Sequence, residues 1–251
     1  MEPEYPVSGV VLGSYNLPRL IELQIRLIRK HNGSATPILI VDDCSPGTGI
    51  TPDPDSVFGD LCEIMRTHED VTLWSNPERY GHAGGDLACY FVGLQWAKMR
   101  KMKVLCKLSQ RMLIDIPNWL HEGAYQLLQS GKPTGCNPCK EDHHHFNLRT
   151  EAILFQVESW YRQDVLDHLR PRPVTGNAAE AIVWHDMEDR VGTDMWRWPI
   201  MGPDRRVRYP GIVWRGSHGI KDYQKLFKEH GVTMDANFTV QNWQQLPGYQ
   251  W

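Results

Sequence analysis

The segment from residue 7 to residue 45 constrains the fold more than any other part of the chain. An apolar run over residues 7–12 is followed by a helical pattern that begins near Pro18 and ends at Asn32-Gly33. A second apolar run follows over residues 38–41. Both runs are typical of strands buried on two faces, and the segment between them is amphipathic, with Leu20, Leu23, Leu27 and Ile28 on one face. This order predicts a parallel βαβ unit.

The same alternation continues to residue 108. We expect helices at residues 57–67 and 86–98 and strands at residues 71–74 and 104–108, with Asn16 and Asp86 as helix caps. The first half therefore predicts an open parallel sheet covered by helices on both faces. The second half is less regular. It predicts helices at 119–129, 162–169 and 180–191, an irregular segment at 132–146, a strand running into a helix at 151–161, short strands at 195–199 and 211–214, and a helix from 222.

Composition excludes several classes of protein. The 251 residues suffice for one α/β domain, and the net charge of -3 gives no overall basic field for nucleic acid. The apolar runs are too short to span a bilayer, and the N-terminus lacks a secretory leader. Six cysteines without such a leader indicate reduced thiols. We therefore expect a cytoplasmic protein with no transmembrane segment.

Polar turns follow four of the predicted strands. In open α/β sheets, ligands bind at the carboxyl ends of the strands. The turns at that edge are Ser14-Tyr15-Asn16, Asp42-Asp43, residues 76–85 and Ser109-Gln110-Arg111. Their convergence predicts a binding site there.

These motifs resemble family 2 of the inverting glycosyltransferases over roughly residues 7–113. The resemblance implies the GT-A fold, a Rossmann-like α/β architecture with an open, mainly parallel sheet flanked by helices. It also implies a nucleoside-diphosphate sugar as donor. By this resemblance, the turn at Ser14, Tyr15 and Asn16 contacts the nucleoside, Asp42 and Asp43 bind the base, and Arg79 meets base, ribose or phosphate.

The chain departs from that family after its fourth strand. Family members carry an Asp-x-Asp motif there, which holds a divalent metal on the donor diphosphate, whereas this chain has Leu108-Ser109-Gln110. Lysine and arginine also neutralise phosphate charge. We therefore expect a transferase without a metal cofactor, in which Arg111, with Lys107 and His218, stabilises the leaving diphosphate and Ser109 and Gln110 contact the donor. Recruitment of a metal by Asp115 or another carboxylate, or loss of activity, remains the alternative.

An inverting transferase needs a carboxylate base to deprotonate the acceptor hydroxyl. In the resembled family, it is the first residue of a Glu-Asp pair at a helix N-terminus, about a dozen residues before a glycine. Glu180 fits that spacing from Gly192, although Ala181 replaces the companion aspartate. The rivals are Asp186, Glu188 and Asp189, which lie closer to the glycine.

Three further patterns point to other chemistry. Cys136, Cys139 and the histidines from His143 have the local spacing of a zinc site. Residues 81–86 are glycine-rich before a helix, which favours anions, but the Walker lysine is missing. Tryptophan can stack on a sugar ring, so the C-terminal tryptophans are candidates for a carbohydrate site or for core packing: Trp184, Trp196, Trp198 and Trp214.

The sequence thus predicts one GT-A domain over residues 1–251. The resemblance assigns binding of the nucleotide sugar to residues 1–115. It assigns the catalytic base and binding of a glycan or glycolipid acceptor to residues 116–251. Synthesis of a surface polysaccharide is a typical setting. Two alternatives stay open. A nucleotidyltransferase shares the sheet order, but the chain lacks a basic, glycine-rich loop after the first strand. A GT-A-like domain without turnover would only bind glycan or nucleotide.

Overall fold

The computed structural model describes residues 5–49, 51, 53–136, 151–174, 190–192, 195–200, 207–214 and 217–238. Strands and helices alternate through the first half, as the sequence predicts. These elements are β1 (Ser8–Ser14), α1 (Pro18–Asn32), β2 (Ile38–Asp42), α2 (Val57–Thr67), β3 (Val71–Ser75), α3 (Gly81–Met99) and β4 (Val104–Leu108). None of the helices in the described ranges is both long enough and apolar enough to cross a bilayer.

The second half contributes shorter elements. They are β5 (Met112–Ile114), α4 (Trp119–Ser130), β6 (Thr134–Cys136), β7 (Ala152–Gln156), α5 (Val157–Trp160), α6 (Gln163–His168), β8 (Met195–Arg197), β9 (Ile212–Trp214) and α8 (Ile220–Glu229). The prediction missed β5 and placed β6 in an irregular segment, because three-residue strands carry too little periodicity to be recognised.

Seven strands form one sheet in the order β3-β2-β1-β4-β7-β6-β8, and β5 pairs with β9 in a separate ribbon. β1 is parallel to β2 and β4, and β2 is parallel to β3. β7 runs antiparallel to both neighbours, β4 and β6. The predicted α/β class with a mainly parallel sheet is confirmed. The antiparallel β7 matters for the site, since its first residue lies beside the carboxyl end of β4.

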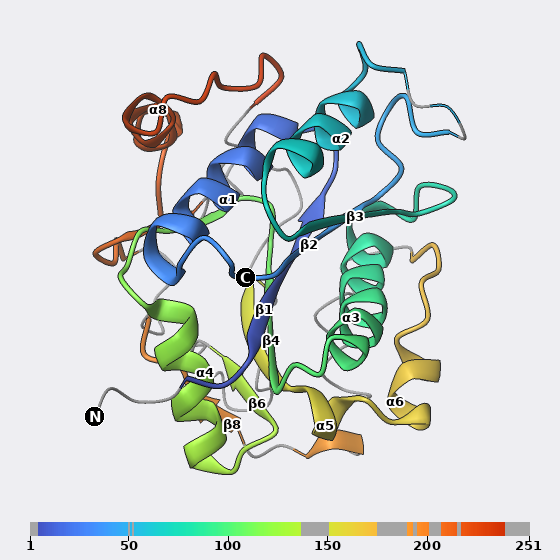
Figure 1. Cartoon of the computed structure of the whole chain (residues 1–251), viewed down its shortest axis with the longest axis vertical. Coiled ribbons are helices and arrows are strands. Elements are labelled where there is room, and N and C mark those ends of the chain that lie inside the picture. The colour runs from blue at the N-terminus through green and yellow to red at the C-terminus, as the bar shows by residue number, and fades with distance from the viewer. Residues whose placement is uncertain are drawn as a thin grey trace, which may run out of the picture.

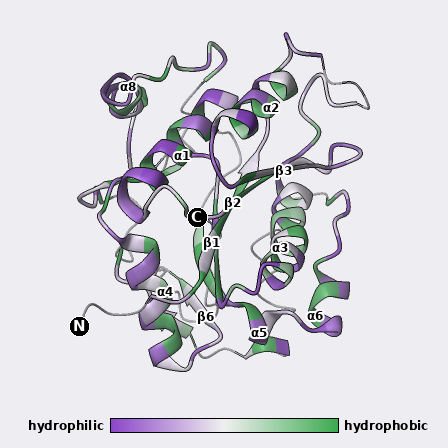
Figure 2. Cartoon of the chain, viewed as in Figure 1, coloured by the Kyte–Doolittle hydropathy of each residue, from purple (hydrophilic) through white to green (hydrophobic). Residues whose placement is uncertain are grey.

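Helices cover both faces of the sheet (Figure 1). Val10 and Leu12 pack with α1, α2 and α4, whereas Val11 and Leu39 pack with α3, α5 and α6. Figure 2 shows hydrophobic residues concentrated along the strands between these layers. Burial of alternate residues on opposite faces explains why the strands are apolar throughout.

Helix α1 is buried on two sides. Ile21, Ile25 and Ile28 face the sheet. Leu20, Leu23 and Leu27 form a third cluster with α8 and the segment after it, through Tyr223, Leu226, Phe227 and Phe238. Leu20, Leu23 and Leu27 thus share a face as predicted, whereas Ile28 lies on the other face. The second face exists because the C-terminal part of the chain returns to cover this helix.

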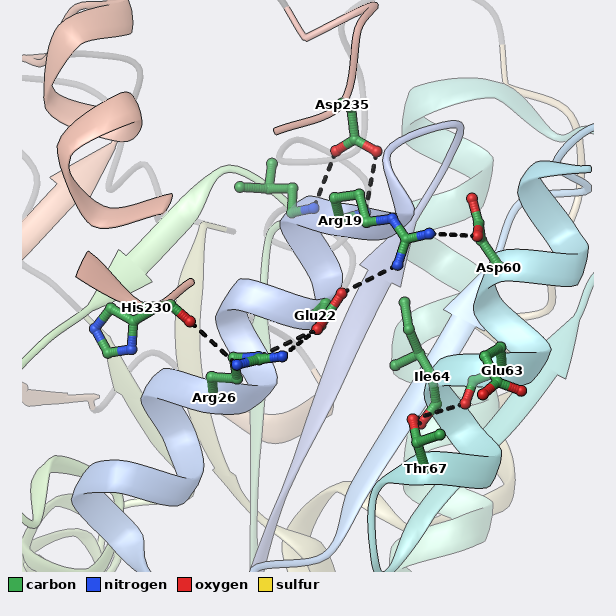
Figure 3. Close-up of polar contacts among 10 residues, drawn as sticks. Arg19, Glu22, Arg26, Asp60, Glu63, Ile64, Thr67, His230 and Asp235 are labelled. Atoms are coloured by element: carbon green, nitrogen blue, oxygen red, sulfur yellow. Dashed lines mark hydrogen bonds and ion pairs between the residues drawn. The ribbon is translucent and has the colours of Figure 1, made fainter. Parts of the chain in front are cut away.

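A distant carboxylate caps α1. Asp235 accepts hydrogen bonds from the backbone N–H groups of Arg19 and Leu20, both at 3.0 Å, across up to 216 positions of sequence. Figure 3 shows Asp235 at the first turn of α1, with Arg19 reaching Asp60 on α2. The predicted cap Asn16 is wrong, because the helix begins after Leu17 and Asn16 adopts a left-handed conformation.

Helix α3 begins at Gly81, five residues before the predicted start. The carboxylate of Asp43 accepts from the N–H groups of Tyr80 and Gly81, each at 2.9 Å. Gly81 has a φ of 78°, which favours glycine. Asp86 therefore lies within the helix, and the prediction that it caps α3 is wrong.

Candidate functional site

A pocket opens at the carboxyl edge of β1, β2 and β4, the edge at which the polar turns were expected to meet. Seven of the predicted residues line it: Ser14, Tyr15, Asp43, Arg79, Ser109, Gln110 and Arg111. Its volume is about 190 Å³. Pockets for small molecules usually hold roughly 300–1,000 Å³, so a ligand as large as a nucleotide sugar would extend beyond it.

Asp42 ends β2 and lies outside the described lining of this pocket. The carboxylate is fully buried and accepts from the Ser45 N–H at 2.7 Å and the Ser45 hydroxyl at 2.5 Å. Burial raises the pKa of Asp42, and the Ser45 hydrogen bonds partly oppose that shift. The Ser45 hydroxyl in turn accepts from the N–H of Asn16 at 3.0 Å. Asp42 thus joins the turn after β1 to the turn after β2.

Asp43 does line the pocket, but both of its oxygens are engaged. Oδ1 accepts from the Asn76 side chain at 3.1 Å and from the Tyr80 N–H, and Oδ2 accepts from the Gly81 N–H. The geometry shows that Asp43 positions the start of α3. Base binding by Asp42 and Asp43 stays a prediction.

Tyr15 and Arg79 form one wall of the pocket. The Arg79 guanidinium lies over the Tyr15 ring, with its carbon 4.1 Å from the ring centroid. The Gln110 side chain donates to the Tyr15 carbonyl at 3.1 Å, which joins the turn after β4 to the turn after β1. A cation stacked on an aromatic ring offers a flat, positively charged surface to a ligand.

Arg111 reaches the pocket just before β5. The Tyr223 hydroxyl on α8 donates to the Arg111 carbonyl at 2.6 Å, and the guanidinium lies 6.0 Å from the centre of the Phe238 ring. The C-terminal segment therefore helps to position this residue. Two arginines line a pocket that the sequence predicts to hold a diphosphate.

Lys107 is fully buried on β4 and lies outside the described lining of the pocket. Its ammonium contacts Asp86 Oδ1 at 2.7 Å and donates to the Ser109 hydroxyl at 3.1 Å. Asp86 itself lines the pocket. The sequence placed Lys107 beside a phosphate, whereas the structure brings it to a carboxylate. A direct contact with the donor stays a prediction.

No protein-family model and no curated protein sequence matches the chain. Solved structures are similar in fold. The mannosyltransferase PcManGT from Pyrobaculum calidifontis, solved in complex with GDP-Man and Mn2+, aligns with a TM-score of 0.54 and 18% identity, over 80% of this chain and 56% of that one. TarS 1-349 of S. aureus aligns with a TM-score of 0.54 and 11% identity, over 89% and 64%.

The galactosyltransferase LgtC, in complex with donor and acceptor sugar analogs, aligns with a TM-score of 0.50 and 9% identity, over 91% of this chain and 98% of that one. This is the GT-A fold. The chain spans just over half of PcManGT and just under two thirds of TarS 1-349. At these identities the similarity concerns the GT-A fold alone, so the residues of the pocket must carry any argument about activity.

Where the resembled family carries its metal-binding carboxylates, this chain has Leu108-Ser109-Gln110, which contains no carboxylate. In the described ranges, no three His, Cys, Asp or Glu side chains lie together so that they could hold a metal ion. Asp115, the alternative metal ligand, contacts Lys30 and His31. Burial opposes ionisation of Asp115, but these two partners outweigh it and lower its pKa. Because the described residues contain no such group of ligands, we derive no step through a metal, and the metal-free reaction stays a prediction.

His218 is buried, and the residues described as lining the pocket do not include it. Its Nδ1 lies 2.8 Å from the Ser217 hydroxyl. Burial lowers the pKa of His218, and nearby Asp222 only partly offsets this shift. The cationic form expected beside a phosphate is therefore disfavoured in the unliganded protein.

Several predicted residues lie outside the described part of the chain. They are Glu180, its rivals Asp186, Glu188 and Asp189, the zinc candidates Cys139 and His143–His145, and Trp184. Cys136 is described and buried, with its sulfur 3.5 Å from that of Met195. Trp196 and Trp198 pack in or against the core, and Trp214 both packs there and lines the pocket.

Sequence reasoning missed Glu151 as a site residue. It immediately precedes β7, and its carbonyl accepts from the Ser109 N–H at 2.7 Å. The sequence prediction placed site residues only at the carboxyl ends of strands. Because β7 is antiparallel, its amino end lies at that same edge, and a polar residue just before an apolar strand was the available signal.

Proposed function

We propose that the protein is a glycosyltransferase that moves a sugar from a nucleoside-diphosphate sugar to a hydroxyl of a glycan or glycolipid, with inversion. The observation that carries this proposal is the pocket at the carboxyl edge of a GT-A sheet, lined by Arg79 and Arg111. Two arginines at a ligand-binding edge suit a diphosphate, because guanidinium groups bind phosphate oxygens in pairs.

The donor would lie across the turns at the end of β1 and β4. Tyr15 and Arg79 offer a stacked surface to the nucleoside, and Ser14, Ser109 and Gln110 supply hydroxyl and amide groups. Asn16, Asp42 and Asp43 hold the turns that shape this surface through Ser45 and the start of α3. His218 is kept as a candidate for contact with the diphosphate on the resemblance alone.

In the proposed reaction, the acceptor oxygen forms a bond to the anomeric carbon while the bond from that carbon to the diphosphate oxygen breaks. The electron pair leaves with the diphosphate, whose added charge Arg111 stabilises. Lys107 either holds Asp86 in place beside the donor or moves to contact the diphosphate itself. Glu180 accepts the hydroxyl proton as general base. We propose that cations of the protein replace the divalent metal.

The first test is nucleotide binding by calorimetry with UDP, GDP and dTDP, followed by turnover in a panel of the matching sugars with and without EDTA. We expect one nucleotide to bind and its sugar to be transferred at an unchanged rate in EDTA. Loss of turnover in EDTA would overturn the metal-free reaction, and binding without turnover would favour a binding domain. In the same assay, Glu180→Gln should abolish turnover and keep donor affinity. The matched changes Glu188→Gln and Asp189→Asn should keep turnover.

A further inference from the structure

Two buried polar atoms of the pocket have no hydrogen-bond partner in the described structure. They are the hydroxyl oxygen of Ser14, a residue that is 4% exposed, and Oε2 of Glu151, a residue that is 8% exposed. Both residues line the pocket. Burying such a group without a partner costs free energy, and a ligand that pairs it recovers that cost. Both atoms therefore point to a polar ligand.

Glu151 differs from the other two carboxylates that line the pocket. Asp43 accepts hydrogen bonds on both oxygens, and Asp86 is neutralised by Lys107 at 2.7 Å. Among the described carboxylates that line the pocket, Glu151 is the one with a buried oxygen that has no hydrogen-bond partner.

The sheet fixes the place of Glu151. The next residue, Ala152, pairs with Leu108 on β4, and the Glu151 carbonyl accepts from the Ser109 N–H. Trp214 also lines the pocket, at the end of β9, where it pairs with Met112 of β5. Glu151 immediately precedes the paired strand β7, and Trp214 ends the paired strand β9. Regular elements of this kind position a binding group more accurately than loops do.

The chemistry of this pair differs from that of the two arginines. A carboxylate repels phosphate, and it accepts hydrogen bonds from hydroxyl groups. An indole ring provides a large, rigid apolar surface that suits the C–H face of a sugar. We propose that Glu151 and Trp214 form the subsite for the donor's sugar, with Glu151 Oε2 accepting a hydrogen bond from a sugar hydroxyl. This inference rests on the proposed function, because it takes the ligand to be a nucleotide sugar.

The test is calorimetry on the full chain with the nucleotide sugar that wild type binds and with the matching free nucleoside diphosphate. For Glu151→Gln we expect at least a tenfold loss of affinity for the nucleotide sugar and less than a twofold change for the free diphosphate. Trp214→Phe should show the same selectivity with a smaller loss. Glu63→Gln, an exposed carboxylate on α2, is the matched control and should leave both affinities unchanged.

A second measurement separates binding from folding. Because an amide costs less to bury than a carboxylate with an unpaired oxygen, Glu151→Gln should unfold at the same or a higher urea concentration than wild type. A lower urea midpoint, equal losses for both ligands, or unchanged sugar affinity would each overturn the subsite. If only free acceptor sugars lose affinity, the site belongs to the acceptor and the donor assignment is wrong. Wild type that binds no nucleotide would instead overturn the proposed function itself.

Discussion

At the scale of single residues, the buried pair of Lys107 and Asp86 is expected to affect stability. The Lys107 side chain is fully buried and that of Asp86 is 11% exposed. Removing one partner leaves a buried charge without compensation, which costs about 3–5 kcal/mol. We therefore expect Lys107→Met to lower the free energy of unfolding by about 3 kcal/mol in urea denaturation followed by circular dichroism.

The double variant Lys107→Met/Asp86→Asn provides the control for that prediction. Because the second change removes the stranded charge, it should recover part of the stability lost in the single variant. Strictly additive losses would show that the two side chains do not interact in solution. The ion pair at 2.7 Å would then contribute no coupling energy.

At the scale of elements, the C-terminal segment after α8 holds α1 in place. Asp235 caps its first turn, and Arg26 donates to the His230 carbonyl at 3.1 Å (Figure 3). Loss of a helix cap costs about 1 kcal/mol. We expect Asp235→Ala to lower the free energy of unfolding by about that amount in urea, and Asp235→Asn, which keeps one acceptor oxygen, to lose less.

The matched comparison is Asp167→Ala on α6. Its carboxylate is half exposed and pairs with Arg170 at 3.2 Å on the surface. Exposed pairs of this kind contribute about 0–1 kcal/mol. Equal losses for Asp235→Ala and Asp167→Ala would mean that the cap adds nothing beyond an ordinary surface carboxylate.

At the scale of the whole molecule, burial of histidines makes stability depend on pH. Burial lowers the pKa of His68, His218 and His230. Since histidine has a pKa of about 6.5 in the unfolded chain, the unfolded state binds more protons below that pH. The contribution of the three histidines to the free energy of unfolding is complete above a pH of about 6.5. It is lost as the pH falls through their pKa values in the folded protein. We expect the urea concentration at the unfolding midpoint to decrease as the pH is lowered from about 7.5 to about 5.5.

His218→Asn is the variant that checks this prediction, and it should flatten the pH dependence. Asp42 and Asp235 change the stability in the opposite direction as the pH falls, because burial raises the pKa of each. Their protonated forms are favoured in the folded state, so their contribution grows as the pH falls toward the acid range. A midpoint that rises from neutral pH down to pH of about 5.5 would contradict the histidine argument.

The fold was more predictable than the site for a physical reason. Strands β2 and β4 are short apolar runs that are buried at every residue, and α2 buries residues at helical spacing. Their sequences alone therefore mark these elements. The position of Glu151 depends on the antiparallel direction of β7, which no local pattern records. Likewise, Lys107 is recognisable as a cation, but its pairing with Asp86 depends on how α3 packs against β4.

Local sequence determined the βαβ alternation, the apolar strands and the polar turns at one edge, because these follow from the spacing of neighbouring residues. It also carried the resemblance that implied the GT-A fold. Tertiary structure alone decided that Asp43 holds the start of α3, that Asp235 caps α1, and that Glu151 and Trp214 share a pocket with Arg111. These contacts join residues far apart in the chain, so they form only when packing brings their elements together.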